Sequence, residues 1–105
     1  MAHKAKPLFS PPSPGEILKN YVVGKSGDKR ITQEELAQAI GMSRLSVNEL
    51  LNGKRPVTAR TAVKLGRVLG TSAAMWLELQ NRRDLFNAEQ YLKDELKKMP
   101  VLRAG

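Results

Sequence analysis

Side chains that can bond to the edges of DNA bases gather in one short stretch, RLSVNELLN at residues 44–52. Arginine can form two hydrogen bonds with guanine, asparagine can form two with adenine, and a carboxylate can only accept, for example from cytosine. On a helix, the polar and outward positions of this stretch share one side: Arg44, Leu45, Asn48, Glu49 and Asn52. These residue types and their spacing predict a helix face that reads double-stranded DNA.

The opposite side of this helix is apolar. At about 100° per residue, Val47, Leu50 and Leu51 fall within one arc of roughly 100°. Ser43 is a suitable N-cap and Gly53 a suitable stop, so we expect a helix over residues 44–51. A helix that packs by one face and carries such side chains on the other is suited to the major groove.

A preceding helix must hold the reading helix in place. Thr32 and Glu35 are spaced as a capping box, and Gly41 can supply the left-handed residue that ends a helix. The apolar stripe between them consists of Leu36, Ala37 and Ile40. Two short helices joined by a tight turn are therefore predicted for residues 32–52.

At these spacings, residues 32–52 resemble the helix-turn-helix of the phage-repressor (lambda repressor and Cro) superfamily. The resemblance rests on Gln33 at the helix start, Ala37 at the crossing, Gly41 in the turn, and Val47 and Leu50 inside the second helix. The match covers about a fifth of the chain. It implies an all-α fold, a five-helix lambda-repressor-like domain, to which we add one C-terminal helix.

The other helices are predicted from caps and stripes. Ser13-Pro14-Gly15-Glu16 is a strong helix start, and that helix should end near Val22 or Val23. Thr58 should cap residues 59–69, with Ala62, Leu65, Val68 and Leu69 on the inner face. Thr71 or Ser72 should cap a helix from residue 73 to about 85, with Met75, Trp76, Leu79 and Leu85 as apolar bulk. Asn87 should cap a last helix that Pro100 stops.

The last helix carries a stripe that must be buried somewhere: Tyr91, Leu92, Leu96 and Met99. It can fold back onto its own domain, or pair with a second copy or another protein. We favour a homodimer, because paired recognition helices gain affinity on half-sites about 34 Å apart.

The composition limits the possible functions. The chain has 105 residues, a formal net charge of +8 and a pI near 10.1. That charge favours a polyanionic partner, although ordinary solubility charge is an alternative. There is no cysteine, no long apolar run and one histidine, His3, in the basic N-terminal stretch. We therefore expect no metal or cofactor, no catalysis, no membrane partner and a cytoplasmic location.

Three segments are expected. Residues 1–12 read as a basic arm that is either disordered or in contact with a phosphate or minor groove. Residues 13–86 form the helix-turn-helix domain, and residues 87–105 the C-terminal helix and tail. Lys54 and Arg55 follow the reading helix, where a loop lies beside the DNA backbone, so they are phosphate contacts or a solvated basic loop.

A narrower resemblance covers residues 13–85, about two thirds of the chain. The chain looks like the HigA (VapI-type) antitoxin family in its succession of motifs: PGEIL, the helix-turn-helix, NGKR, TARTA, LGTS, and WLELQ with Asp84-Leu85. The resemblance implies dimers that repress their own operon at its operator and neutralise a HigB toxin, an mRNA endonuclease similar to RelE. Two features depart from the family, the long loop at residues 25–30 and Glu49 on the reading face.

The combined prediction is a sequence-specific repressor and antitoxin. Base edges are assigned to Arg44, Leu45, Asn48 and Glu49, and phosphates to Gln33, Ser43, Asn52, Lys54 and Arg55. Leu45 can contact a thymine methyl group or be an exposed leucine without a role in binding. Glu49 can pair with Arg44 or a loop cation instead of a base. The rival interpretations are a solitary phage-type regulator without a toxin, a protein-interaction module, and a nuclease.

Overall fold

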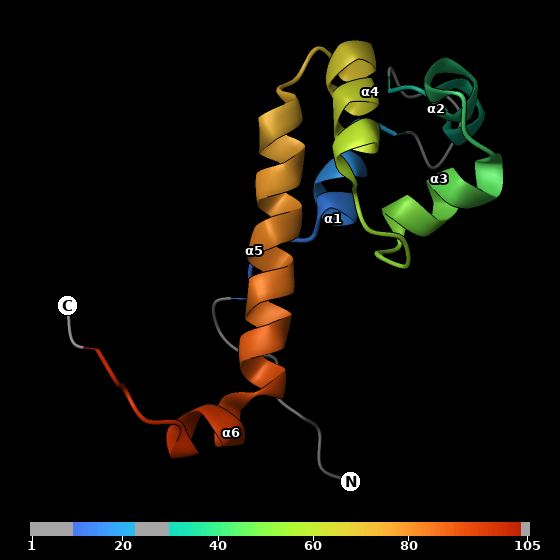
Figure 1. Cartoon of the computed structure of the whole chain (residues 1–105). Coiled ribbons are helices and arrows are strands. Elements are labelled where there is room, and N and C mark those ends of the chain that lie inside the picture. Colours follow the sequence, from blue (N-terminus) through green and yellow to red (C-terminus); the bar gives the residue numbers. More distant parts are fainter. Residues whose placement is uncertain (1–9, 23–29, 104–105) are drawn as a thin grey trace, which may run out of the picture.

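The computed structural model describes residues 10–22 and 30–103. Six helices follow one another in these ranges: α1 (Pro14–Leu18), α2 (Gln33–Ile40), α3 (Arg44–Leu51), α4 (Ala59–Leu69), α5 (Ala73–Tyr91) and α6 (Lys93–Lys98). Figure 1 shows α4 running alongside the upper half of α5, with α1 beside them and the α2–α3 pair on the far side of α4. The predicted all-α fold of five helices plus one is confirmed.

The core lies where α1, α2, α3, α4 and the first half of α5 meet. Its largest fully buried side chains are Trp76, Leu18, Leu36, Leu50, Leu65 and Val47. Trp76 is central: its ring contacts Tyr21 edge-on at 6.1 Å between centroids, and its indole Nε1 donates to Thr71 Oγ1 at 2.7 Å. A buried tryptophan needs such an acceptor. Thr71 therefore supports the core, and Ser72 caps α5.

The first helix is shorter than expected. It ends at Leu18, not near Val22 or Val23, and turn residues follow. Val22 instead forms an isolated bridge with Ile31, and the Ile31 N–H donates to Tyr21 O at 3.1 Å. The chain leaves the helix because this extended pairing places Val22 in the core, 6 % exposed.

The helix break predicted at Asn87 was wrong. Helix α5 runs without interruption through Asn87 to Tyr91, and α6 begins at Lys93 with no side-chain cap. A residue that can cap a helix does not by itself start one, and no glycine or proline precedes Asn87 within α5 to favour a break there.

The inner-face assignment of Val68 and the expected contribution of Leu85 to the apolar bulk were also wrong. Val68 is 38 % exposed and Leu85 is 62 % exposed. Val68 lines an open groove with residues 38–41 at the end of α2, and this groove leaves it partly in contact with solvent. Leu85 lies on the part of α5 that extends beyond the core. The stripe predicted on the last helix is largely uncovered as well: Tyr91 is 89 %, Leu96 45 % and Met99 57 % exposed, and Leu92 is half-buried. Folding back onto its own domain is therefore not what this stripe does.

Some sequence predictions fall on residues that the structure does not describe. The expected arm, residues 1–12, and the loop at residues 25–30 lie largely outside the described residues, as does residue 23. The last residues before α1 are held by Arg83 of α5, whose Nη1 donates to Ser10 Oγ at 2.6 Å and to Pro11 O at 2.9 Å. Within the ranges 10–22 and 30–103, none of the helices has the length and apolar character that a membrane span requires.

Candidate nucleic-acid interface

Local hydrogen bonds hold the two helices of the motif as predicted. Thr32 and Glu35 form the complete capping box, with both hydrogen bonds at 3.0 Å. Gly41 follows α2 with φ of 67°, a left-handed conformation that favours glycine. Ser43 then caps α3, its Oγ accepting from the Ser46 N–H at 3.0 Å. These bonds fix where α3 starts relative to α2.

The end of α3 reverses the chain sharply. The Lys54 N–H donates to Glu49 O at 2.8 Å and the Gly53 N–H to Leu50 O at 3.3 Å, with Gly53 at φ of 70°. These two bonds around a left-handed glycine form a Schellman motif. The loop carrying Lys54 and Arg55 therefore folds back beside the last turns of α3.

The inner and outer faces of α3 divide as predicted. Val47, Leu50 and Leu51 are buried. Arg44 and Asn48 are exposed on the other side, and Leu45 is 70 % exposed. An exposed row of this kind on a packed helix is free to enter a groove of DNA.

Two residues of the reading face are joined to each other. Asn52 Nδ2 donates to Asn48 O at 2.9 Å and to Asn48 Oδ1 at 3.2 Å. The Asn48 amide is therefore held in one orientation, with its Nδ2 donor directed away from this bond. Asn52, assigned to a phosphate, also serves to orient Asn48.

Glu49 pairs with a loop cation, one of the alternatives raised from the sequence. Its Oε1 accepts from Arg55 Nη2 at 2.9 Å and from Arg55 Nε at 3.3 Å. The Glu49 side chain is 32 % exposed and the Arg55 side chain 44 %. The carboxylate is thus neutralised on the reading face, and Arg44 is not its partner.

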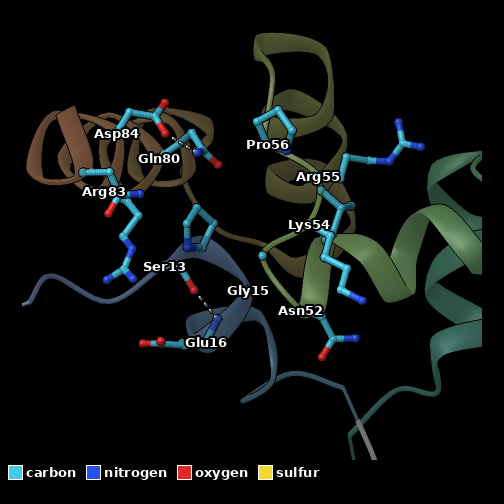
Figure 2. A pocket seen from close by; sticks show the side chains of 14 residues that line it. Ser13, Gly15, Glu16, Asn52, Lys54, Arg55, Pro56, Gln80, Arg83 and Asp84 are labelled. Carbon is cyan, nitrogen blue, oxygen red and sulfur yellow. Dashed lines mark hydrogen bonds between the residues drawn. The ribbon is translucent and has the colours of Figure 1, made fainter. Parts of the chain in front are cut away.

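The loop from Asn52 to Pro56 is supported from behind by α1 and α5. A polar cavity of about 430 Å³ lies between them, and Figure 2 shows Lys54 and Arg55 pointing away from Gln80 and Asp84 on α5. Gln80 secures the loop exit, because its Oε1 accepts from the Val57 N–H at 2.8 Å while its Nε2 donates to Asp84 at 2.9 Å. Lys54 and Arg55 therefore project outward from a fixed backbone.

A groove beside the reading face adds residues that the sequence patterns did not indicate. It has a volume of about 370 Å³, and its polar lining consists of Lys19, Arg30, Gln33, Asn48 and Asn52. Arg30 Nη1 donates to Lys19 O at 3.0 Å, across 11 residues of sequence. Lys19 and Arg30 were missed because no local periodicity connects the end of α1 with the residue before the Thr32 cap.

The assigned phosphate contacts surround the reading face. Gln33 is half-buried at the first position of α2, and Ser43 is exposed but occupied, since its Oγ donates to Ser46 Oγ at 2.9 Å. Lys54 is exposed in the loop. From residue 44 to residue 67, six residues are basic and only Glu49 is acidic. This part of the surface suits a polyanion.

The acidic residues near this surface have structural roles that the hydrogen bonds explain. In the ranges 10–22 and 30–103, no three histidine, cysteine or acidic side chains gather as metal ligands would. Hydrogen bonding from the Thr32 backbone, with a smaller contribution from its side chain, lowers the pKa of Glu35 below its ordinary 4.5. This shift is caused by the capping box at the start of α2.

Comparison with known proteins identifies the family of the chain. Residues 28–76 match the family model described as "Helix-turn-helix". The antitoxin HigA-1 of Vibrio cholerae is 37% identical over 87 residues, which are 83% of this chain and 79% of that protein. The chain belongs to the HigA family. Another relative of this HigA-type chain is virulence-associated protein I of Dichelobacter nodosus, 38% identical over 73% of this chain and 68% of that protein.

Solved structures agree with this membership. The Pseudomonas aeruginosa antitoxin HigA with the higBA promoter has a TM-score of 0.76 and 29% identity, covering 90% of this chain and 99% of that one. The antitoxin GraA in complex with its operator has a TM-score of 0.76 and 31% identity, covering 96% and 99%. This HigA-type chain thus shares its fold with relatives solved on DNA.

Proposed function

We propose that this HigA-type chain binds the operator of its own operon as a homodimer, represses transcription, and neutralises a HigB-type mRNA endonuclease toxin in the cytoplasm. The observation that carries the proposal is the exposed face of α3, where Arg44, Leu45 and Asn48 project beside a basic loop. Relatives of the same fold were solved with promoter or operator DNA.

The proposal assigns roles by position. Arg44, Leu45 and Asn48 contact base edges, and the phosphates lie against Gln33, Ser43, Asn52, Lys54 and Arg55. Lys19 and Arg30 extend the phosphate track, because they line one groove with Gln33 and Asn48. Residues 13–86 bind DNA, and the uncovered stripe within residues 87–105 joins two copies.

The deciding experiment is a titration of the purified protein onto the duplex just upstream of its gene, with a scrambled duplex as the control, at two salt concentrations. Specific repression requires a preference for the native duplex, a palindromic footprint and a salt slope of about 0.9 per phosphate contact. Equal weak binding to both duplexes would leave only a general polyanion surface and would contradict the proposal.

The alternative function is that of a solitary regulator. The presence or absence of a toxin partner distinguishes it from an antitoxin. Co-expression with the product of a neighbouring small reading frame should yield a stable complex that no longer cleaves mRNA. A chain that represses its operator but has no such neighbour would be the solitary regulator. RNA cleavage by the chain alone would instead identify it as a nuclease.

A further inference from the structure

Glu49 is the one acidic residue in the basic stretch from residue 44 to residue 67, and it lies on the helix face assigned to DNA. A carboxylate there is repelled by phosphates and can only accept a hydrogen bond from a base. Its Oε1 is already the acceptor of two N–H groups of Arg55. The structure therefore directs this oxygen toward the loop, where the carboxylate has a cation of its own chain as partner.

The backbone brings the two side chains together independently of the ion pair. The Lys54 N–H bonds to the carbonyl oxygen of Glu49 itself, and the left-handed Gly53 reverses the chain. Arg55 thus returns beside the residue that its guanidinium contacts, six positions earlier. Main chain and side chain of Glu49 both tie the loop to α3.

Arg55 keeps donors for a second partner. A guanidinium has five N–H groups, and two of them bond to Glu49. In the described part of the chain, Arg55 donates to no other group. Its planar fork can hold a carboxylate on one side and a phosphate on the other. The exposed ion pair itself contributes little to folding.

We propose that Glu49 is a positioning residue that holds the guanidinium of Arg55 for a phosphate of the operator, and that it does not read a base. The inference rests on the proposed operator binding. Glu49, which departs from the family pattern, would then order the long side chain of Arg55 before DNA binds. A side chain that is already ordered loses less entropy when it binds.

The test is a double-mutant cycle on the full chain, using Glu49→Ala, Arg55→Ala and the double variant. Arg55→Ala should weaken both native and scrambled duplexes about fivefold and make the salt slope shallower by about 0.9. Glu49→Ala should cause a similar loss although it removes a negative charge. In the Arg55→Ala background it should cause no loss, because no cation remains to be positioned.

Two further variants control the cycle. Glu78→Ala breaks the Glu78–Arg82 ion pair on α5, 2.6 Å long and exposed, and should leave DNA binding unchanged. Glu49→Gln keeps an oxygen acceptor of the same reach, so its affinity should stay within about twofold of wild type. Circular dichroism spectra that match the wild type would exclude unfolding as the cause of a loss.

The outcomes separate the inference from the function it rests on. If Glu49→Ala tightens binding in both backgrounds, the carboxylate merely repels DNA and the inference is overturned. If it changes the preferred base at one position regardless of Arg55, Glu49 is a base reader, and the inference is again overturned. If the wild type shows no preference for the native duplex, the proposed function fails and the inference with it.

Discussion

At the scale of single residues, the surface around α3 contains cations with different surroundings. Arg44 stands in the first turn of the reading helix, exposed. Lys54 stands in the loop that α5 supports through Gln80. A side chain that meets base edges distinguishes sequences, whereas one that meets a phosphate attracts every sequence alike. Position on the element, and not charge, should therefore decide what each cation contributes.

Replacing Arg44 with alanine should cost about 1–3 kcal/mol of binding free energy on the operator and relax one base position. The reason is the loss of a bidentate contact to guanine. Binding to a panel of operator variants, each changed at one position, measures both effects. Equal losses on operator and random DNA would remove Arg44 from base readout.

Replacing Lys54 with alanine should weaken binding to all sequences alike and make the salt slope shallower by about 1. The reason is the release of one fewer counterion when the phosphate contact is lost. The same panel, repeated at two salt concentrations, checks this. A selective loss on the native operator would instead show that Lys54 reads sequence.

At the scale of elements, a close approach between helices fixes the reading helix. A Cβ built on Gly15 of α1 would lie 2.4 Å from Leu50 O and 2.5 Å from Leu51 O, at the end of α3. Those atoms are backbone and cannot rotate away. The absence of a side chain at Gly15 therefore allows α1 to rest on the end of α3.

Gly15→Ala should lower the free energy of unfolding by about 1–3 kcal/mol, because α1 must shift to admit the methyl group. Urea unfolding measures the change. Glu16→Ala, on the exposed side of the same helix, serves as control and should stay close to wild type. A Gly15→Ala protein as stable as wild type would contradict the contact.

The cap of α2 predicts a pH dependence. The pKa of Glu35 is lowered in the folded state, so its carboxylate stabilises the fold above the unfolded pKa. That contribution is lost as the pH falls through the folded pKa. The stability difference between wild type and Glu35→Gln should thus be constant near pH 7 and shrink below about pH 4.5. Urea unfolding across this range checks it, and a pH-independent difference would contradict it.

At the scale of the whole molecule, the end of α5 and α6 project away from the core. The radius of gyration is 17.1 Å, against roughly 13 Å for a compact chain of about 100 residues. Figure 1 shows α6 turned away from α5 at the far end. The exposed apolar side chains there are Leu85, Tyr91, Leu96, Met99, Val101 and Leu102. An apolar end of this kind is typical of an interface between subunits.

Leu96→Glu combined with Met99→Glu should convert the proposed dimer to a monomer, because both residues lie on the uncovered apolar end. Light scattering gives the mass, and circular dichroism should show an intact fold, since neither side chain is buried in the single chain. Val63→Glu, also at an exposed apolar site but on α4, should remain dimeric. A double variant that stays dimeric would place the interface elsewhere.

The helix-turn-helix could be predicted because its signals act over one or two turns. Thr32 and Ser43 bond to amides three residues away, Gly41 and Gly53 take the left-handed conformation, and the apolar stripe repeats with the helix period. None of these depends on a distant partner. The outward placement of Leu45 follows from the same period.

Other features were decided only in three dimensions. Helix α1 stops at Leu18 because Val22 pairs with Ile31, and Val68 stays partly exposed because the groove between α4 and the end of α2 is open. Helix α5 continues past Asn87 to Tyr91, since a residue that can cap a helix does not by itself start a new one.

By itself, the sequence determined the all-helical class, the reading helix and the residue types that face DNA, because caps, turns and periodicity are local properties of the chain. Only the tertiary structure decided that Glu49 bonds to Arg55 and not to Arg44, and that Lys19 and Arg30 join the groove of Gln33. These contacts join segments that the sequence separates, and their geometry exists only once the turns and the packed helices have brought the segments together.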